Sequence, residues 1–297
     1  MARFLASCRT APRENGLQQM PRSRPFRQID VFTTTPCLGN PVAVVLDGDD
    51  LSTEEMQRFA RWMNLSETTF VLPPSSPQAD YRVRIFTPTL ELPFAGHPTL
   101  GTCRAWLETG GTPRDPNAIL QECEAGVVIV RPAEAGFEFA APALRREGPV
   151  DEATASEVLR ALRLDRSHLV DLAWADNGPG WIAVLLESAE DVLKLVPAYT
   201  ELAIGVAGAY PTGSPEAFEV RAFFPKDGAL AEDPVTGSFN ASLAQWLTVS
   251  GRAHPPYVAR QGTALGRSGR VHITQDANAV IWVGGGTVTC VEGTVDL

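Results

Sequence analysis

A short cassette occurs twice in this chain, about 136 residues apart, and this repeat constrains the fold more than any other feature. Each copy begins with the pattern R-x-F-x-P, at residues 84–88 and again at 221–225. Each continues through residues 96–101 (GHPTLG) or 233–237 (DPVTG) into an apolar-periodic stretch that ends in x-W-L. A strand, a Pro-bearing loop and a helix are expected in that order. The repeat therefore predicts two halves of similar construction, with a matched half-site in each.

The helix starts are the chemically informative part of the cassette. We expect His97 and Asp233 at N-cap positions, because the prolines that follow them, Pro98 and Pro234, suit a first helical position that needs no N–H donor. Small residues around them would leave the amides uncovered, and such a helix end attracts a carboxylate or phosphate. In a single copy, the same residues are more typical of simple helix initiation and close helix packing. The matched second copy favours a site that holds a small acid between two helix ends.

A second echo supports the duplication, since residues 39–44 (GNPVAV) resemble residues 178–184 (GPGWIAV) at a similar offset. The expected N-terminal half covers residues 26–145 and the C-terminal half residues 150–284, joined by the charged, Pro-flanked stretch 145–149. The N-terminal half could also include a last strand, in residues 285–297.

Residues 1–25 form a basic leader. Six arginines and one acid lie in the first 28 residues, so the remainder carries 19 bases against 34 acids, a net charge of −15. We expect this leader to be a disordered extension or the product of a misassigned start, with Met20 as an alternative start; a transit peptide is the other interpretation.

Composition favours an enzyme-like body and excludes some partners. The chain has 297 residues, of which 44% are hydrophobic, and no apolar run approaches the ~20 residues that span a bilayer. The acidic body would repel nucleic acid. The five cysteines are scattered without a C-x-x-C pair, which is typical of reduced thiols in a cytoplasmic protein. The expected location is therefore the cytoplasm, without a membrane or nucleic-acid partner.

Local patterns predict a mixed α/β chain. The best-marked helix covers residues 53–63, with a capping box at Ser52 and Glu55 and a stop at Asn64. Few connections look like regular βαβ units, so we expect an α+β fold in which two antiparallel or mixed sheets each wrap around a central helix. Further strands are predicted near residues 28–33, 41–46, 68–72, 81–87, 127–131, 181–186, 219–224, 270–274 and 280–283, and further helices near 155–162 and 234–249.

Glu67 is the candidate catalytic acid. It lies among small hydroxyl residues just before an apolar strand, and a carboxyl group in a cleft with little water has its charged form disfavoured, which raises its pKa toward the range useful for proton transfer. An exposed loop glutamate that caps its neighbours is the alternative interpretation of the same residue.

Three segments together resemble the signature segments of the phenazine-biosynthesis PhzF-like isomerase family: residues 66–70 (SETTF), 94–101 (FAGHPTLG) and 232–238 (EDPVTGS). They occur in the family's order and spacing, and the resemblance extends from about Ile29 to the C-terminus. It implies the fold of diaminopimelate epimerase, in which two similar halves enclose the active site. It also implies a homodimer that needs no metal and no organic cofactor.

The resemblance assigns a role to each matching residue. Glu67 matches the family's general acid/base, which in the phenazine-pathway member removes a proton from C3 of trans-2,3-dihydro-3-hydroxyanthranilate before a proton is returned at C1. His97 and Asp233 match the residues that contact the substrate's amino and hydroxyl region and help to relay the proton. The small residues that match those beside the substrate are Gly96, Gly237 and Ser238.

The expected function is thus a cofactor-independent isomerase of a small cyclic or amino-acid-like carboxylate, with Glu67 moving the proton. One alternative is an epimerase or racemase that uses His97 and Asp233, although relatives of that kind carry cysteines there and Cys103 lies too far along its helix to substitute. The other alternative is a protein that binds a small acid without turnover. Phe239 departs from the small residue usual in the family, and we expect its ring to narrow or reshape the pocket.

Other chemistries find no support in the sequence. It contains no G-x-x-x-x-G-K-[ST] loop, no H-E-x-x-H motif and no G-x-G-x-x-G after a strand. His168, His254 and His272 lie far from one another and from acids at ligand spacing, so a zinc site is not expected.

Overall fold

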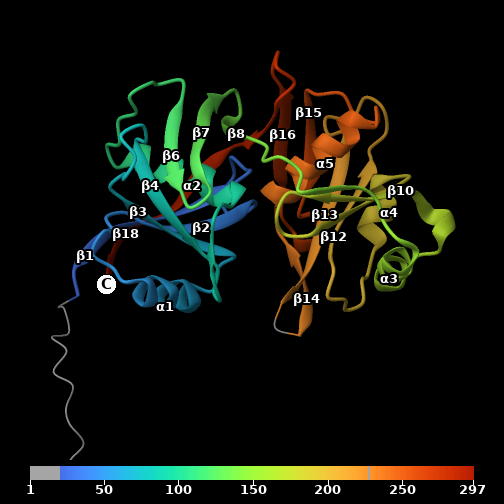
Figure 1. Cartoon of the computed structure of the whole chain (residues 1–297), viewed down its shortest axis with the longest axis horizontal. Helices are drawn as coiled ribbons and strands as arrows, with labels where there is room; N and C mark the ends of the chain where they lie inside the picture. Colours follow the sequence, from blue (N-terminus) through green and yellow to red (C-terminus); the bar gives the residue numbers. More distant parts are fainter. Residues whose placement is uncertain (1–20, 227) are drawn as a thin grey trace, which may run out of the picture.

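The computed structural model describes residues 21–226 and 228–297, and within them the chain forms two bodies side by side, each with one helix surrounded by strands (Figure 1). The two central helices are α2 (Gly96–Glu108) and α5 (Gly237–Val249). The α+β class predicted from the sequence is confirmed. The leader falls mostly on residues 1–20, which lie outside the described residues. The folded part begins at Ser23, slightly before the predicted start at residue 26.

Alternating burial explains why the strands surround these helices. In β4, Tyr81, Val83 and Ile85 are buried while Arg82 and Arg84 are partly exposed, so one face of the strand packs inward. The strands of the N-terminal half are β1 (Ser23–Val31), β2 (Asn40–Val45), β3 (Glu67–Leu72), β4 (Tyr81–Phe86), β5 (Glu91–Leu92), β6 (Ile119–Cys123), β7 (Gly126–Ala133), β8 (Gly136–Ala140) and β18 (Thr287–Asp296).

The C-terminal half repeats this plan. Its strands are β9 (Arg146–Pro149), β10 (Leu169–Asp176), β11 (Trp181–Leu186), β12 (Ala203–Ala209), β13 (Phe218–Lys226), β14 (Ala229–Asp233), β15 (Tyr257–Gln261), β16 (Gly269–Gln275) and β17 (Ile281–Gly285). The remaining helices are α1 (Thr53–Met63), α3 (Glu152–Leu162) and α4 (Ala189–Lys194), with short 3-10 turns at Arg166–His168 and Thr263–Leu265.

The pairing of the strands shows the duplication directly. From β18 the hydrogen-bonded ladder runs through β1, β2, β3, β4, β6, β7 and β8, and from β9 it runs through β10, β11, β12, β13, β15, β16 and β17. Parallel pairs occupy the same places in both halves: β2 with β3 and β4 with β6, and then β11 with β12 and β13 with β15. The two ladders meet where β8 pairs antiparallel with β17.

The repeated R-x-F-x-P cassette forms the same ion pair in each half. Arg84 on β4 donates two hydrogen bonds to Glu91, at 2.7 and 2.6 Å, and Arg221 on β13 donates two to Glu232, at 3.0 and 2.7 Å. In both halves the pair joins one arm of a hairpin to the other, β4 to β5 and β13 to β14. The sequence repeat therefore corresponds to a repeated supersecondary unit.

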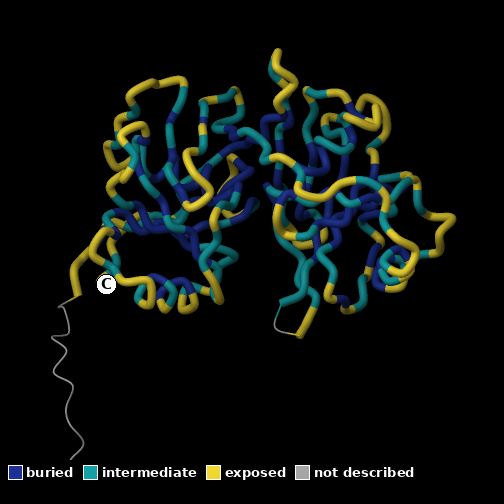
Figure 2. The backbone as a smooth tube through the Cα atoms, in the orientation of Figure 1, coloured by how far each residue is buried: buried dark blue, intermediate teal, exposed yellow. Residues whose placement is uncertain are grey.

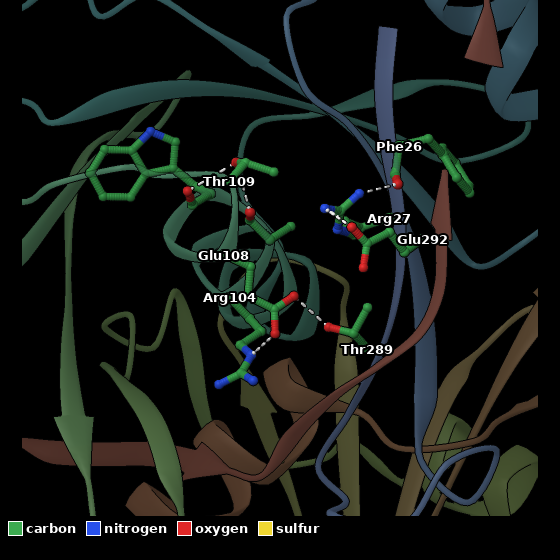
Figure 3. A network of polar contacts seen from close by, with 9 residues as sticks. Phe26, Arg27, Arg104, Glu108, Thr109, Thr289 and Glu292 are labelled. Carbon is green, nitrogen blue, oxygen red and sulfur yellow. Dashed lines mark hydrogen bonds and ion pairs between the residues drawn. The ribbon is translucent and has the colours of Figure 1, made fainter. Parts of the chain in front are cut away.

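The last strand belongs to the first sheet. β18 pairs with β1 along its length, and side chains hold it in place (Figure 3). Arg27 of β1 donates to Glu292 at 2.7 Å, and Thr289 of β18 donates to Glu108 of α2 at 2.6 Å. Arg104 contacts the same Glu108 carboxylate at 2.7 Å. In Figure 1 this strand runs from the C-terminal half back behind the blue and cyan strands of the N-terminal half.

Several local predictions need correction. The stretch expected as a linker contains strand β9, which pairs with β10, because an extended segment beside an open sheet edge satisfies its backbone donors and acceptors there. Neither His97 nor Asp233 is an N-cap. The N-cap of α2 is Ala95 and that of α5 is Thr236, so His97 is the second residue of its helix and Asp233 ends strand β14.

The ring of Phe239 is also placed differently from the expectation. Its side chain is fully buried in the core of the C-terminal half, where a Cβ on Gly205 would lie 2.1 Å from the ring. Its ring centroid lies 5.4 Å from that of Trp181. The glycine on β12 makes the room that the larger ring needs, so Phe239 contributes to the packing of this core.

The core is continuous through both halves. Buried residues of α2, α5 and the inner faces of the sheets form one cluster, while α3 and α4 cover the outer face of the C-terminal sheet and α1 covers part of the N-terminal one. Figure 2 shows this as a dark interior in each body beneath exposed loops. Among the described residues, no helix combines the length and apolar character needed to cross a membrane.

Candidate active site

Glu67 and His97 meet in the interior between the halves. Glu67 is the first residue of β3, where it pairs with Val42 of β2, and His97 lies in the first turn of α2. The Oε2 atom of Glu67 lies 3.3 Å from Nε2 of His97, and the two side chains are only 15% and 6% exposed. Neither atom has a hydrogen-bond partner of good geometry within the described structure. Both are therefore available to a molecule that enters the site.

Asn40 connects this pair to the other half of the protein. Its Nδ2 atom donates to Oδ1 of Asp233 at 3.0 Å and to the carbonyl oxygen of Val235 at 2.9 Å, and it lies 3.5 Å from Nδ1 of His97. Asn40 is fully buried at the start of β2. The amide of Asn40 on β2 thus fixes the position of Asp233 on β14 relative to His97 on α2.

The side-chain amide of Gln261 also supports the turn that carries Asp233. Thr236 donates its hydroxyl hydrogen to Oδ2 of Asp233 at 2.7 Å, so both carboxylate oxygens have a partner. Gln261, the last residue of β15, donates to the Thr236 hydroxyl at 2.9 Å and to the Asp233 carbonyl at 3.1 Å. It also accepts from the Thr236 amide at 2.9 Å. These bonds fix the turn that carries Asp233.

The N-termini of the two central helices abut beside these side chains. Neither helix start carries a side-chain cap among the residues described. A Cβ placed on Gly237 would lie 3.3 Å from the Gly96 Cα and from the His97 amide nitrogen, so the two ends touch. Ser238 follows directly, and its hydroxyl accepts a hydrogen bond from the Trp181 indole at 3.0 Å. Free amide donors at paired helix ends form a site suited to an anion.

Burial sets the protonation states of the three ionisable groups. Burial, together with the nearby negative charge of Asp233, raises the pKa of Glu67 to about 8, against an opposing effect of Lys226. Burial lowers the pKa of His97 to about 3 despite the Pro41 carbonyl, which favours the charged form. Near neutral pH the Glu67–His97 contact therefore joins a mostly protonated carboxyl group to a neutral imidazole, and it is not an ion pair.

Asp233 behaves differently from Glu67. Burial raises its pKa to about 6, and the charge of Glu232 acts in the same direction, while the hydrogen bonds from Thr236 and Asn40 oppose the rise. Near neutral pH Asp233 is mostly ionised while Glu67, linked to it through His97 and Asn40, is mostly protonated. Two carboxyl groups whose environments separate their pKa values are typical of an acid/base site.

The sequence match is consistent with this geometry. The family model described as "Phenazine biosynthesis-like protein" matches residues 29–293. The chain belongs to this family. Among relatives, the trans-2,3-dihydro-3-hydroxyanthranilate isomerase of Pseudomonas aeruginosa is 37% identical over 256 residues, which cover 82% of this chain and 87% of that protein. Relatives of this chain carry isomerase names.

Another relative of this chain carries a different name, and a solved structure is similar to this chain. The protein named antisense-enhancing sequence 1 of Schizosaccharomyces pombe is 37% identical over 290 residues, covering 90% of this chain and 97% of that protein. The crystal structure of the Bacillus anthracis phenazine biosynthesis protein of the PhzF family superposes with a TM-score of 0.77 at 25% identity, covering 92% and 99% of the two chains.

The structure brings together every site residue predicted from the sequence and adds three more. Glu67, His97 and Asp233 converge, and Gly96, Gly237 and Ser238 lie at the touching helix ends. The additional residues are Asn40, Thr236 and Gln261. A sequence signal existed for Asn40, since it lies in residues 39–44, which residues 178–184 resemble, and for Thr236, which lies within the second cassette. Gln261 had none, because it reaches the site only through the pairing of β15 with β13.

Possible metal ligands were also compared in space. Within residues 21–226 and 228–297, no three side chains of His, Cys, Asp or Glu gather as they would around a metal ion. His168 and His272 lie on separate elements, the 3-10 turn after α3 and strand β16.

Proposed function

We propose that this member of the phenazine biosynthesis-like family is a cofactor-independent isomerase of a small cyclic or amino-acid-like carboxylate, in which Glu67 moves a proton between two carbon atoms. The observation that carries the proposal is the contact between Glu67 Oε2 and His97 Nε2, 3.3 Å apart, beside two uncapped helix ends; neither of these two atoms has a hydrogen-bond partner among the described residues. The active site lies between two pseudo-symmetric halves in this proposal.

Glu67 suits both directions of proton transfer. A carboxyl group with a pKa of about 8 is mostly protonated near neutral pH but keeps an ionised fraction, so it can accept a proton from one carbon and return it to another. In the proposed step the ionised Glu67 takes the proton from a C–H bond, the electron pair of that bond shifts the double bonds, and the same proton is delivered to a second carbon. The substrate and product then have the same composition.

His97 and Asp233 would hold the polar groups of the substrate. The neutral imidazole of His97 presents a nitrogen toward Glu67 and can help to relay the proton. The ionised Asp233, fixed on both oxygens, would accept hydrogen bonds from an amino or hydroxyl group. The amides at Gly96, Gly237 and Ser238 would bind the carboxylate and keep the reacting carbons in line with Glu67.

The substrate to test first is trans-2,3-dihydro-3-hydroxyanthranilate, because a relative with 37% identity is named an isomerase of that compound. The chain is incubated with it in deuterated water, and product and deuterium uptake are followed by mass spectrometry. Conversion that Glu67→Gln abolishes would support the proposal. Glu219→Gln is the matched control, since Glu219 is a buried glutamate that lies in the C-terminal sheet, bonded to Tyr210.

The other outcomes separate the alternatives. Deuterium that enters a stereocentre without any shift of double bonds would favour an epimerase that uses His97 and Asp233. Binding of the acid without exchange, in the wild type and in Glu67→Gln alike, would favour a binding protein. Sedimentation of the same sample tests the homodimer that we propose from the family resemblance.

A further inference from the structure

Gln261 occupies a position that the repeat of the fold makes informative. It ends β15, which pairs parallel with β13, and Gln121 lies in the middle of β6, which pairs parallel with β4 in the other half. Both glutamines are fully buried. Each reaches the first turns of its central helix: Gln121 donates to Thr99 at 2.9 Å, and Gln261 accepts from Asn240 at 2.8 Å. A buried glutamine that braces the central helix is thus common to both halves.

The hydrogen bonds that continue from the two glutamines lead to different groups. On its other side Gln121 accepts a hydrogen bond from the Tyr81 hydroxyl at 3.0 Å, so that chain ends in the core. Gln261 instead donates to the hydroxyl of Thr236, and that hydroxyl contacts the carboxylate of Asp233. Only the C-terminal brace leads to a group of the active site.

The direction of these hydrogen bonds is determined by chemistry. An amide NH₂ group can only donate, so the Thr236 oxygen accepts from Gln261 Nε2 and its single hydrogen must point elsewhere. The nearest acceptor is Oδ2 of Asp233, at 2.7 Å. The identity of the amide atoms is itself secure, because Oε1 of Gln261 accepts from two donors, the Thr236 amide and Asn240 Nδ2. Every donor and acceptor of the Gln261 amide therefore has a partner.

We propose that Gln261 is a positioning residue that turns the Thr236 hydroxyl toward Asp233 and so keeps the buried Asp233 carboxyl group ionised. This inference rests on the proposed function, in which Asp233 contacts the substrate as an anion. Hydrogen bonds in a chain polarise one another and become stronger, and a chain whose last donor contacts a carboxylate favours the charged form of that carboxylate. Without Gln261 the Thr236 hydroxyl would be free to rotate and to accept a hydrogen bond from a protonated, neutral Asp233.

Other charged groups around Asp233 act against its ionisation. Glu232 precedes it on β14 and raises the pKa of Asp233, while Glu67 of β3 has its own pKa raised by the charge of Asp233. Arg221 of β13 neutralises Glu232 through two hydrogen bonds, and Lys226 of the same strand acts on Glu67. His97 of α2 is neutral. The direct stabilisation of the Asp233 anion thus comes from Asn40 and from the Gln261–Thr236 chain.

The test measures the pKa of Asp233 itself, by carbon-13 NMR of protein labelled at the aspartate carboxyl carbons, with Asp233→Asn to assign the resonance. Gln261→Met removes the amide at similar volume, and Thr236→Val removes the hydroxyl. We expect each to raise the pKa of Asp233 by about one unit or more, the size that the loss of a charge-assisted hydrogen bond produces. The matched control, Gln121→Met, should leave that pKa within about 0.3 unit of the wild type.

The double variant Gln261→Met/Thr236→Val tests the route of the effect. If Gln261 acts through the Thr236 hydroxyl, the pKa of Asp233 in the double variant equals that in Thr236→Val alone. An unchanged pKa in Gln261→Met, an equal shift in Gln121→Met, or additive shifts in the double variant would each overturn the proposal. If Gln261→Met fails to fold, an unchanged pKa in Thr236→Val overturns it equally well.

This readout does not depend on turnover. A chain without isomerase activity in which Gln261→Met raises the Asp233 pKa would refute the proposed function and support the positioning role. An active chain in which the pKa stays constant would do the opposite. In an active chain with the predicted shift, the acid limb of kcat/KM should move to higher pH in Gln261→Met and stay in place in Gln121→Met.

Discussion

Gly96 and Gly237, the first residues of the two central helices, lie in direct contact, with 3.3 Å between the Gly96 Cα and the position of a Cβ on Gly237. Two helix ends that approach this closely combine their amide donors on one small volume. The positive ends of both helix dipoles then favour the same bound anion.

Gly237→Ala should weaken both substrate binding and the fold. The added methyl group would press against the Gly96 backbone, so the helix ends must separate by a few tenths of an ångström. We expect KM to rise about tenfold and the free energy of unfolding to fall by about 1–2 kcal/mol. Steady-state kinetics and urea denaturation measure the two effects. Gly293→Ala, where the added methyl group meets open space on β18, should change neither.

The pH dependence of activity should report on Glu67. Because burial and Asp233 raise the pKa of Glu67 to about 8, the ionised base is scarce at low pH, and kcat/KM should increase with pH and level off above that value. Asp233→Asn removes a negative charge that raises this pKa, so the pKa of Glu67, measured by carbon-13 NMR, should fall in that variant. A rate profile with its midpoint near about 4.3, the value of an ordinary glutamate, would contradict the assignment of Glu67 as the base.

Glu67 should destabilise the protein at alkaline pH. Its pKa is about 8 when folded and 4.5 in the reference state, so between these values the folded state binds more protons than the unfolded state, and stability falls as pH rises. Glu67→Gln has no such loss. We expect this variant to exceed the wild type in free energy of unfolding by roughly 2–5 kcal/mol at pH 9, with no such gain at pH 4. Denaturant titrations at both pH values measure this difference in free energy of unfolding, with the exposed Glu124→Gln as control.

The duplicated ion pairs should differ in strength. Arg221 and Glu232 are 7% and 10% exposed, against 19% and 26% for Arg84 and Glu91. Arg221 also donates to the carbonyl groups of Val192 and Leu195 at the end of α4. Removing one partner of a buried pair leaves an uncompensated charge, so Arg221→Met should cost about 3–5 kcal/mol and Arg84→Met about 1–2 kcal/mol in chemical denaturation. Equal losses would show that burial does not distinguish the two pairs.

Cys103→Ser should preserve catalysis. Cys103 is fully buried in α2, and burial raises the pKa of its thiol to about 12, so the thiol stays protonated and does not act as a base. We expect kcat to remain within about twofold of the wild type, with a loss of about 1–2 kcal/mol in stability from the buried hydroxyl. Loss of most of the activity would contradict the proposed mechanism.

The sequence predicted best what short-range chemistry determines. The helix over residues 53–63 was located from its capping box and its stop at Asn64, and α1 has these bounds, with Asn64 in the left-handed region. Both central helices were found as well, but their starts were misplaced. Pro98 is tolerated in the first turn, where its missing N–H has no partner to lose, so the proline did not mark the first position.

Long-range contacts explain the remaining differences. The turn from Asp233 to Thr236 is held by hydrogen bonds to Gln261 on another strand, and no local sequence pattern predicts these bonds. Strand β12, with the sequence AIGVAGA, was missed because it is buried on both faces and shows no alternation. The proximity of Glu67 and His97 was expected from the family resemblance alone, since it depends on how α2 packs on β3.

The end strands of the two halves come from different parts of the chain, and this has a consequence for synthesis on the ribosome. The N-terminal half receives its outer strand β18 from the last residues of the chain, whereas the C-terminal half receives β9 from the segment that joins the halves. The first half to be translated is thus the last to complete its sheet. A short truncation at the C-terminus would consequently expose the edge of β1, more than two hundred residues away in sequence, and leave Glu67 on an unfinished scaffold.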